Sequence, residues 1–397
     1  MFLGIIKYYF YGIISKYMKA GTKNYYRGIA IMVGTIVGVG IFGVPYVVAQ
    51  SGVWIGLGLF LVLGAVLTIN HLMFGEIILR TGVKHHLANL AEIYLGPKWE
   101  YFAVAITTLG FYGALIAYII LGGEFLEIVL SPFFGANLLV YQILFFAFMA
   151  FFVLVGLRLV AFSELLMSAL LILAMAVIVF AGVPKVSFAN FLGADFKNAF
   201  LPYGVILFSL TGAAAVPEVI EIMSRTKKKI KGAIVWGSVI PIVLTLVFAF
   251  VVVGVNGILT TPDAVEGLGS ALGQWVMFLG AVFGLFAVAT SFLILALYLK
   301  EQFWFDLKIN KHLSWFLACF IPFILFLTGS RDFIKVIGFT GAVFAGLEGI
   351  LIIWIYRIAA QKSKRKPEYN LRLPFAILFL MVLIFLGGVV YEIWTLF

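Results

Sequence analysis

The stretch Gly34–Pro45, GTIVGVGIFGVP, lies inside an apolar run long enough to cross a lipid bilayer. It contains four glycines and one proline in twelve residues. Inside a helix, glycine costs about 1 kcal/mol and proline about 3 kcal/mol relative to alanine. A membrane-spanning segment tolerates such residues where the freed backbone groups line a cavity or hold a ligand. The stretch therefore predicts a helix that is interrupted within the membrane.

A second stretch, Leu207–Pro217 (LFSLTGAAAVP), has the same pattern. In each stretch a glycine stands five residues before a proline, with a valine directly ahead of the proline (Gly40 and Pro45; Gly212 and Pro217). Two interrupted helices at corresponding places in two halves of a membrane protein are typical of the central site of a secondary transporter.

The composition indicates an integral membrane protein. The chain is 64% hydrophobic and 11% charged, against about 25% charged residues in a soluble domain, so it cannot form a water-soluble surface. Cys319 is the only cysteine, which excludes an intrachain disulfide framework and a multi-cysteine metal site. The net charge of +10 follows membrane topology, as shown next, and we expect no nucleic-acid partner.

About 20 apolar residues span a bilayer, and this rule predicts eleven transmembrane helices in an all-α polytopic protein. We expect them at residues 27–50, 53–79, 97–130, 138–156, 160–181, 198–223, 231–254, 271–299, 311–328, 333–358 and 373–395.

The placement of basic residues supports this count. With the N-terminus in the cytoplasm, 23 of the 27 Lys and Arg residues fall in inner segments, leaving only Lys185, Lys197, Arg331 and Lys335 outside. This bias is the positive-inside rule. It predicts a plasma-membrane protein with its C-terminus outside the cell.

The topology also predicts an inverted repeat. Two units of five helices, residues 27–181 and 198–358, would enter the membrane in opposite orientations, with the interrupted helices as helix 1 and helix 6. Residues 1–26 would form a basic cytoplasmic segment, 182–197 an outer loop, and 359–397 a basic inner loop with an additional eleventh helix.

The two breaks predict a site for a zwitterion. The N–H end of a half-helix favours an anion, and the C=O end favours a cation. We expect backbone groups at the first break to bind a substrate carboxylate, from Thr35, Gly38, Val39, Gly40 and Ile41, and a side chain added at Gly40 to occupy the pocket. We expect carbonyls at the second break to bind an ammonium, from Phe208, Ser209, Thr211 and Gly212. The alternative is that these glycines only allow close helix packing.

The first stretch resembles the helix 1 signature of the amino acid–polyamine–organocation permeases, roughly G-x-x-x-G-x-G-I-F-x-x-P. The matching residues are Gly34, Gly38, Gly40, Ile41, Phe42 and Pro45. The second stretch, with the VIEIMSRTKKKIKGAI that follows it, resembles helix 6 and the basic loop after it. The expected number of helices, eleven rather than twelve, resembles that of the aromatic and neutral amino acid permeases, a branch of the same superfamily. The resemblance implies a leucine-transporter-type fold that works by alternating access.

This resemblance also implies a cation site and substrate contacts. In sodium-coupled members the helix 8 segment pairs with helix 1, and the matching ligands here are the carbonyls of Gly34, Val37 and Ala287 and the side chains of Thr290 and Ser291. Alternatively, the two hydroxyls hydrogen bond within their own helix. Tyr112 resembles a substrate-facing tyrosine, and Phe208 resembles an aromatic gate.

Proton coupling remains an alternative to sodium. Ionisable residues inside a bilayer are functional candidates, and Glu348 and Glu218 are our candidates for a proton relay. Glu218 directly follows Pro217, where its carboxylate would also cap a half-helix. Proton-driven relatives place a lysine from helix 5 in the cation site, and the expected helix 5 contains none.

We therefore predict a permease, not an enzyme, that moves a neutral or aromatic amino acid with sodium or proton coupling. We expect no cofactor beyond a coupling ion, and the sequence leaves the oligomeric state open. The alternatives are a proton-coupled permease for a polyamine or another small cationic or heterocyclic solute, and an amino acid sensor with this fold. A channel would need a continuous polar stripe along several helices, which the sequence lacks.

Overall fold

Long helices make up most of the structure. The computed structural model describes residues 20–82, 86–135, 137–156, 160–329, 331–363 and 365–395. The basic segment expected at 1–26 therefore lies largely outside the described residues. The helices of the first half are α2 (Ala20–Ile36), α3 (Gly40–Ser51), α4 (Val53–Thr81), α5 (Leu87–Leu95), α6 (Pro97–Phe134), α7 (Leu138–Val155) and α8 (Val160–Gly182), followed by the short 3₁₀ turns η1 (Val183–Lys185), η2 (Phe188–Phe191) and η3 (Phe196–Asn198).

The second half continues with two half-helices and further long helices. In order these are α9 (Leu201–Leu210), η4 (Ala213–Ala215), α10 (Val216–Ile222), η5 (Lys227–Lys229), α11 (Ile230–Asn256), η6 (Gly257–Leu259), α12 (Leu268–Leu272), α13 (Gln274–Glu301), the π-helical η7 (Gln302–Asp306), α14 (Lys311–Thr328), α15 (Phe333–Phe339), the π-helical η8 (Thr340–Ala345), α16 (Gly346–Lys362) and α17 (Phe375–Trp394).

The prediction of an all-helical membrane protein is confirmed. Among the described residues, nine helices are long and apolar enough to cross a membrane, and the bent pair α2–α3 makes ten. Helix α8 covers the expected fifth span, and Leu171–Lys185 is an apolar helical stretch shorter than a full span. The count of eleven and the inverted repeat stay predictions.

Several helix boundaries differ from the predicted ones. The first helix begins at Ala20 rather than 27, and the tenth continues to Lys362 rather than 358. Helix α5 was not predicted. It forms because Leu87, Leu90, Ala91 and Tyr94 present one buried apolar face, a pattern too short to be read as a membrane span.

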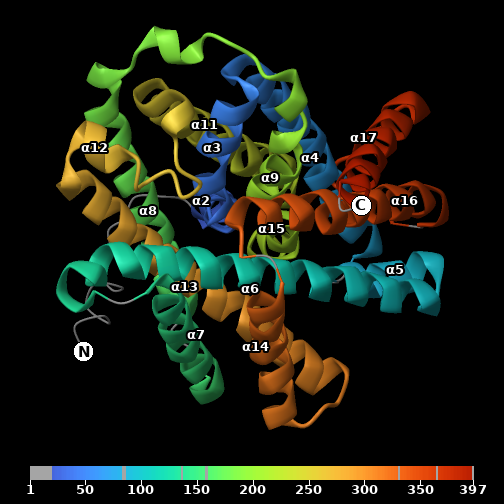
Figure 1. The fold of residues 1–397 in the computed structure, drawn as a ribbon. Helices are drawn as coiled ribbons and strands as arrows, with labels where there is room; N and C mark the ends of the chain where they lie inside the picture. The colour runs from blue at the N-terminus through green and yellow to red at the C-terminus, as the bar shows by residue number, and fades with distance from the viewer. Residues whose placement is uncertain are drawn as a thin grey trace.

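The helices form two groups (Figure 1). The long α6 crosses the bundle and packs against α7, α13 and α14, whereas α2 packs against α10 and α11, and α3 packs against α9. The two broken helices thus belong to one group, and α6 and α13 belong to the other. Helix α17 lies at the edge of the bundle and contacts α16.

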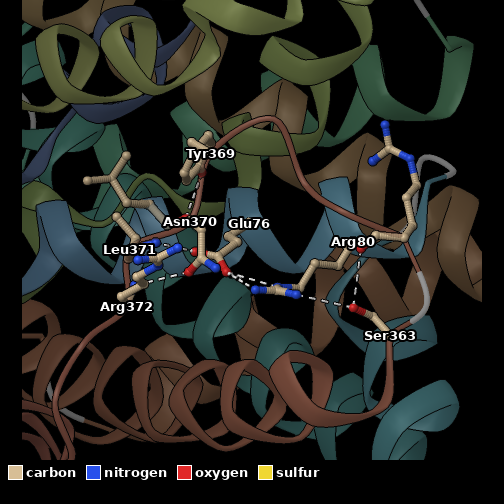
Figure 2. A network of polar contacts seen from close by, with 9 residues as sticks. Glu76, Arg80, Ser363, Tyr369, Asn370, Leu371 and Arg372 are labelled. Carbon is tan, nitrogen blue, oxygen red and sulfur yellow. Dashed lines mark hydrogen bonds and ion pairs between the residues drawn. The ribbon is translucent and has the colours of Figure 1, made fainter.

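The extended residues 365–374, which precede α17, and Ser363, which follows α16, are tied to α4 (Figure 2). The Glu76 carboxylate, fully buried, accepts hydrogen bonds from the backbone N–H of Leu371 (2.8 Å) and from Arg80 (2.9 Å). Arg80 also donates to the Ser363 hydroxyl (3.3 Å), and the Tyr369 hydroxyl donates to the Leu72 carbonyl (2.7 Å). These bonds use both oxygens of a buried carboxylate, so Glu76 acts as a structural anchor.

The same segment is also linked to the loop that follows α10. Glu368 forms ion pairs with Arg365 (2.7 Å) and with Lys227 (3.6 Å). Partial burial raises the pKa of Glu368, but the hydrogen bond from Arg365 and the charge of Lys227 together lower it below its usual value. Residues 365–374 therefore connect α4 to the loop that follows α10.

The first prediction concerns this anchor. Replacing Glu76 by Gln removes one charge of a buried pair and leaves Arg80 unpaired, so the free energy of unfolding should fall by about 3 kcal/mol or more. The melting temperature of the purified protein in detergent measures the loss. Glu92→Gln is the matched control because the side chain of Glu92 is exposed. Equal melting temperatures for the two variants would contradict this assignment.

Candidate functional site

The first predicted break is present between α2 and α3. Residues Val37–Val39 leave the helical path, and the two half-helices meet at 58°. The N–H groups of Val37 and Gly38 bond to the carbonyls of Val33 (2.8 Å) and Ile36 (2.9 Å). The N–H of Val39 has no acceptor among the described residues. The break therefore presents an unpaired donor at the start of α3, where the helix dipole also favours negative charge.

The second predicted break is present between α9 and α10. Thr211 and Gly212 are not helical, and η4 turns the chain into α10. The Thr211 hydroxyl donates to the Leu207 carbonyl (2.7 Å). The Gly212 N–H donates to Nε2 of His71 on α4 (3.1 Å) rather than along its own helix. Side chains thus replace part of the missing helical hydrogen bonding.

The two breaks are in direct contact. A Cβ atom added to Gly40 would lie 2.6 Å from Cα of Ser209 on α9, and a Cβ added to Gly212 would collide with Ile36 on α2. Only glycine allows this approach, so close packing accounts for Gly40 and Gly212. A Cβ added to Gly40 would meet Ser209 and Phe208 on α9, which line the same cavity as Gly40, so the expectation that a side chain there would occupy the pocket stays a prediction. At Gly38 an added Cβ would meet no atom within 4 Å.

A cavity of about 330 Å³ adjoins both breaks. This volume is within the range of about 300–1,000 Å³ for small-molecule sites. Of the residues predicted to bind substrate, eight line the cavity: Thr35, Gly38, Val39, Gly40, Phe208, Ser209, Thr211 and Gly212. Aromatic side chains make up much of the remaining wall: Phe74, Phe111, Tyr118, Tyr298 and Phe344. The cavity therefore combines an aromatic part of its wall with the backbone groups of the two breaks, and further polar side chains, among them Gln302 and Glu348, also line it.

Two predicted substrate residues are elsewhere. Ile41 is buried outside the cavity lining, and its N–H bonds to the Gly38 carbonyl (3.3 Å). The Tyr112 hydroxyl donates to the Leu317 carbonyl on α14 (3.0 Å), so this side chain points toward α14. Tyr118, six residues further along α6 and about 120° around the helix, lines the cavity instead. Of these two tyrosines, only Tyr118 therefore lines the cavity, and the substrate contact of Tyr112 stays a prediction.

A smaller cavity of about 80 Å³ lies beside the first. All five predicted cation ligands line it: Gly34, Val37, Ala287, Thr290 and Ser291. Thr35 and Tyr118 line both cavities. The Thr290 hydroxyl donates to the carbonyls of Phe286 (3.1 Å) and Ala287 (3.0 Å) within its own helix. Its oxygen lone pairs remain available toward the cavity, because donation uses only the hydrogen.

Both proton-relay candidates line the larger cavity. Glu218 comes from α10, where its side chain is exposed, and Glu348 comes from α16, where it is half-buried. Among the described residues, neither carboxylate has a hydrogen-bond or ion-pair partner. Glu348 follows the π-helical η8, whose Thr340, Phe344 and Ala345 also line the cavity. π-Helical turns often occur at functional sites, but their position has no clear sequence signal.

Comparisons with known proteins agree with this geometry. Residues 21–395 match the model of the tryptophan/tyrosine permease family. The chain is 23% identical to "Glutamine transporter 2" of Aliivibrio fischeri, over 86% of this chain and 91% of that protein. It is 25% identical to "Tyrosine-specific transport system 1" of Haemophilus influenzae, over 83% and 87%. The crystal structure of MhsT in complex with L-phenylalanine has a similar fold, with a TM-score of 0.64 and 16% identity, over 93% of this chain and 98% of that one.

The second prediction compares Gly40, whose Cβ position is occupied by α9, with Gly38, whose Cβ position is open. Gly40→Ala should lower the free energy of unfolding by about 1–3 kcal/mol, because the new methyl group overpacks the contact with Ser209. Gly38→Ala should leave the melting temperature unchanged, because its Cβ enters open space. Thermal unfolding in detergent compares the two. A larger loss at Gly38 than at Gly40 would contradict the contact between α3 and α9.

Proposed function

The chain belongs to the tryptophan/tyrosine permease family, so it is an amino acid permease and not an enzyme, and we propose that it moves a neutral or aromatic amino acid across the plasma membrane by alternating access. The observation that carries the proposal is the contact between two interrupted helices at one cavity. The family and the relatives named above support amino acids as the substrate class.

In this proposal each end of the zwitterion binds one break. The unpaired N–H of Val39 and the dipole of α3 bind the carboxylate, with the Thr35 hydroxyl nearby. The carbonyls at the end of α9 bind the ammonium, since a half-helix presents partial negative charge at its C-terminus. Because both groups come from the backbone, this part of the site recognises every α-amino acid.

The side chain of the substrate would occupy the aromatic part of the cavity. Phe74, Phe111, Phe208, Phe344 and Tyr118 line it. Aromatic pairs gain about 0.5–1.5 kcal/mol beyond the area they bury, which favours tyrosine, tryptophan or phenylalanine. Leucine or glutamine would fit the volume but would lose these contacts.

The cavity extends toward the end of the bundle that carries most of the basic residues. Its lining includes His86, Leu87 and Ala88 after α4, and Tyr298 and Gln302 near the end of α13. With the N-terminus in the cytoplasm, as the charge bias predicts, these residues lie on the inner side. The outer half-helices α3 and α9 pack together, and so do the inner half-helices α2 and α10. The lining on this side supports an inward-facing arrangement of two inverted five-helix units, with residues 359–397 as an addition.

For the coupling ion we propose sodium in the smaller cavity. Gly34, Val37, Ala287, Thr290 and Ser291 would supply neutral oxygen ligands, which suit a hard monovalent cation. Thr35 and Tyr118 line both cavities, so ion and substrate would share walls. The second candidate is proton coupling, with a cationic or heterocyclic solute as its substrate. It is favoured by the two carboxylates, Glu218 and Glu348, that face the larger cavity without a described partner.

The third prediction tests function and coupling together. Purified protein in proteoliposomes should accumulate labelled tyrosine or tryptophan when a sodium gradient is imposed, and labelled spermidine should not accumulate. Thr290→Ala combined with Ser291→Ala should abolish the sodium dependence and leave sodium-free substrate binding detectable. Thr328→Ala is the control, because its hydroxyl also bonds within its own helix (2.9 Å to Ile324) but is exposed at a helix end.

The ion dependence decides between the two candidates. Uptake that follows an imposed pH gradient, ignores sodium and is lost in Glu348→Gln would contradict the sodium assignment and support proton coupling. Uptake of spermidine without uptake of any amino acid would contradict the proposed substrate class. Binding of amino acids without accumulation under either gradient would indicate a sensor.

A further inference from the structure

One imidazole connects three helices at the second break. His71 lies on α4 and is 1% exposed. Its Nε2 is 3.1 Å from the backbone nitrogen of Gly212, and its Nδ1 is 3.1 Å from the hydroxyl oxygen of Ser238 on α11. Every polar atom of this buried side chain is therefore used.

The partners define the protonation of the ring. A backbone N–H can only donate, so Nε2 of His71 must accept and carries no proton. In the neutral imidazole the proton is then on Nδ1, which donates to the Ser238 hydroxyl. A doubly protonated ring would place two N–H groups against each other at Gly212. This geometry requires the neutral form with one defined tautomer.

The hydrogen bond from Gly212 changes which carbonyls are free. In a continuous helix the N–H of Gly212 would donate to the carbonyl of Phe208, four residues earlier. His71 takes this donor instead. The neighbouring carbonyl of Leu207 receives a substitute donor, the Thr211 hydroxyl. The carbonyl of Phe208 therefore loses its helical donor, and Phe208 lines the cavity.

We propose that His71 is a positioning residue: by accepting the N–H of Gly212 it keeps the helix open at the second break and leaves the Phe208 carbonyl to the ammonium of the substrate. The inference rests on the proposed function for its last step only. The hydrogen bond that holds the break is a property of the protein without substrate.

Two substitutions at His71 separate its two hydrogen bonds. The side-chain oxygen of Gln reaches about as far as Nε2, so His71→Gln keeps an acceptor for Gly212. The shorter Asn reaches about as far as Nδ1, so His71→Asn keeps a partner for Ser238 and leaves Gly212 without one. Ser238→Ala is the control that removes only the Nδ1 partner.

The expected result is a selective loss of affinity. His71→Asn should raise the KM and the Kd for labelled tryptophan or tyrosine by about tenfold or more, the loss expected for a misplaced hydrogen bond to a charged group. Binding of the matching carboxylic acid without an amino group should change by less than about threefold, because it does not use the Phe208 carbonyl. His71→Gln should restore affinity to within about threefold of the natural protein. Equal affinities for the Asn and Gln variants, whether high or low, would overturn the proposal.

A measurement on the unsubstituted protein covers the case in which a variant does not fold. Hydrogen exchange resolved to single amides, without substrate, should show the N–H of Gly212 exchanging at least about tenfold more slowly than that of Val39, which has no described acceptor. Equal rates would overturn the role of His71. If no amino acid binds the natural protein, the proposed function fails, while the exchange measurement still decides the role of His71.

Discussion

Inside a bilayer, a backbone N–H or C=O group must find a partner in the protein or in a ligand, because the lipid offers none. The structure satisfies this requirement unequally at its two breaks. At the second break, side chains act as substitutes: Thr211 caps the Leu207 carbonyl, and His71 accepts the N–H of Gly212. At the first break, the N–H of Val39 has no partner among the described residues. Within the described part of the chain, each break nevertheless keeps one backbone group without its helical partner, the N–H of Val39 at the first and the carbonyl of Phe208 at the second.

The same constraint links the breaks to the rest of the bundle. Because α3 and α9 touch at Gly40 and Ser209, the two breaks cannot move independently at this point. Residues 365–374 bind α4 through Glu76 and reach the loop after α10 through Lys227. His71 adds a third connection, between α4, Gly212 and α11. Together these contacts tie α2, α4, α10 and α11 to one another around the two breaks.

The sequence was sufficient for the breaks because glycine and proline within an apolar run conflict with the local preference for helix. It also located the five residues around the smaller cavity, although through a family resemblance. It named Tyr112 through the same resemblance and did not indicate Tyr118, because both lie on the long α6 and their directions depend on how that helix packs. It identified Gly40, which lines the larger cavity, but not the close contact of Gly40 with Ser209, since a glycine needed for packing looks the same in a sequence as one that only lines a cavity. The role of His71 depends on tertiary contacts with Gly212 and Ser238, which are 141 and 167 residues away.

The claim that both breaks bind the same zwitterion is tested most directly by equilibrium binding to the purified protein. Tryptophan would be compared with tryptamine, which lacks the carboxylate, and with indole-3-propionic acid, which lacks the amino group. If both breaks bind the zwitterion, each analogue should bind at least about tenfold more weakly than tryptophan, since each lacks a charged hydrogen-bonding group. If either analogue binds as tightly as tryptophan, the corresponding break does not recognise the substrate, and the account is contradicted.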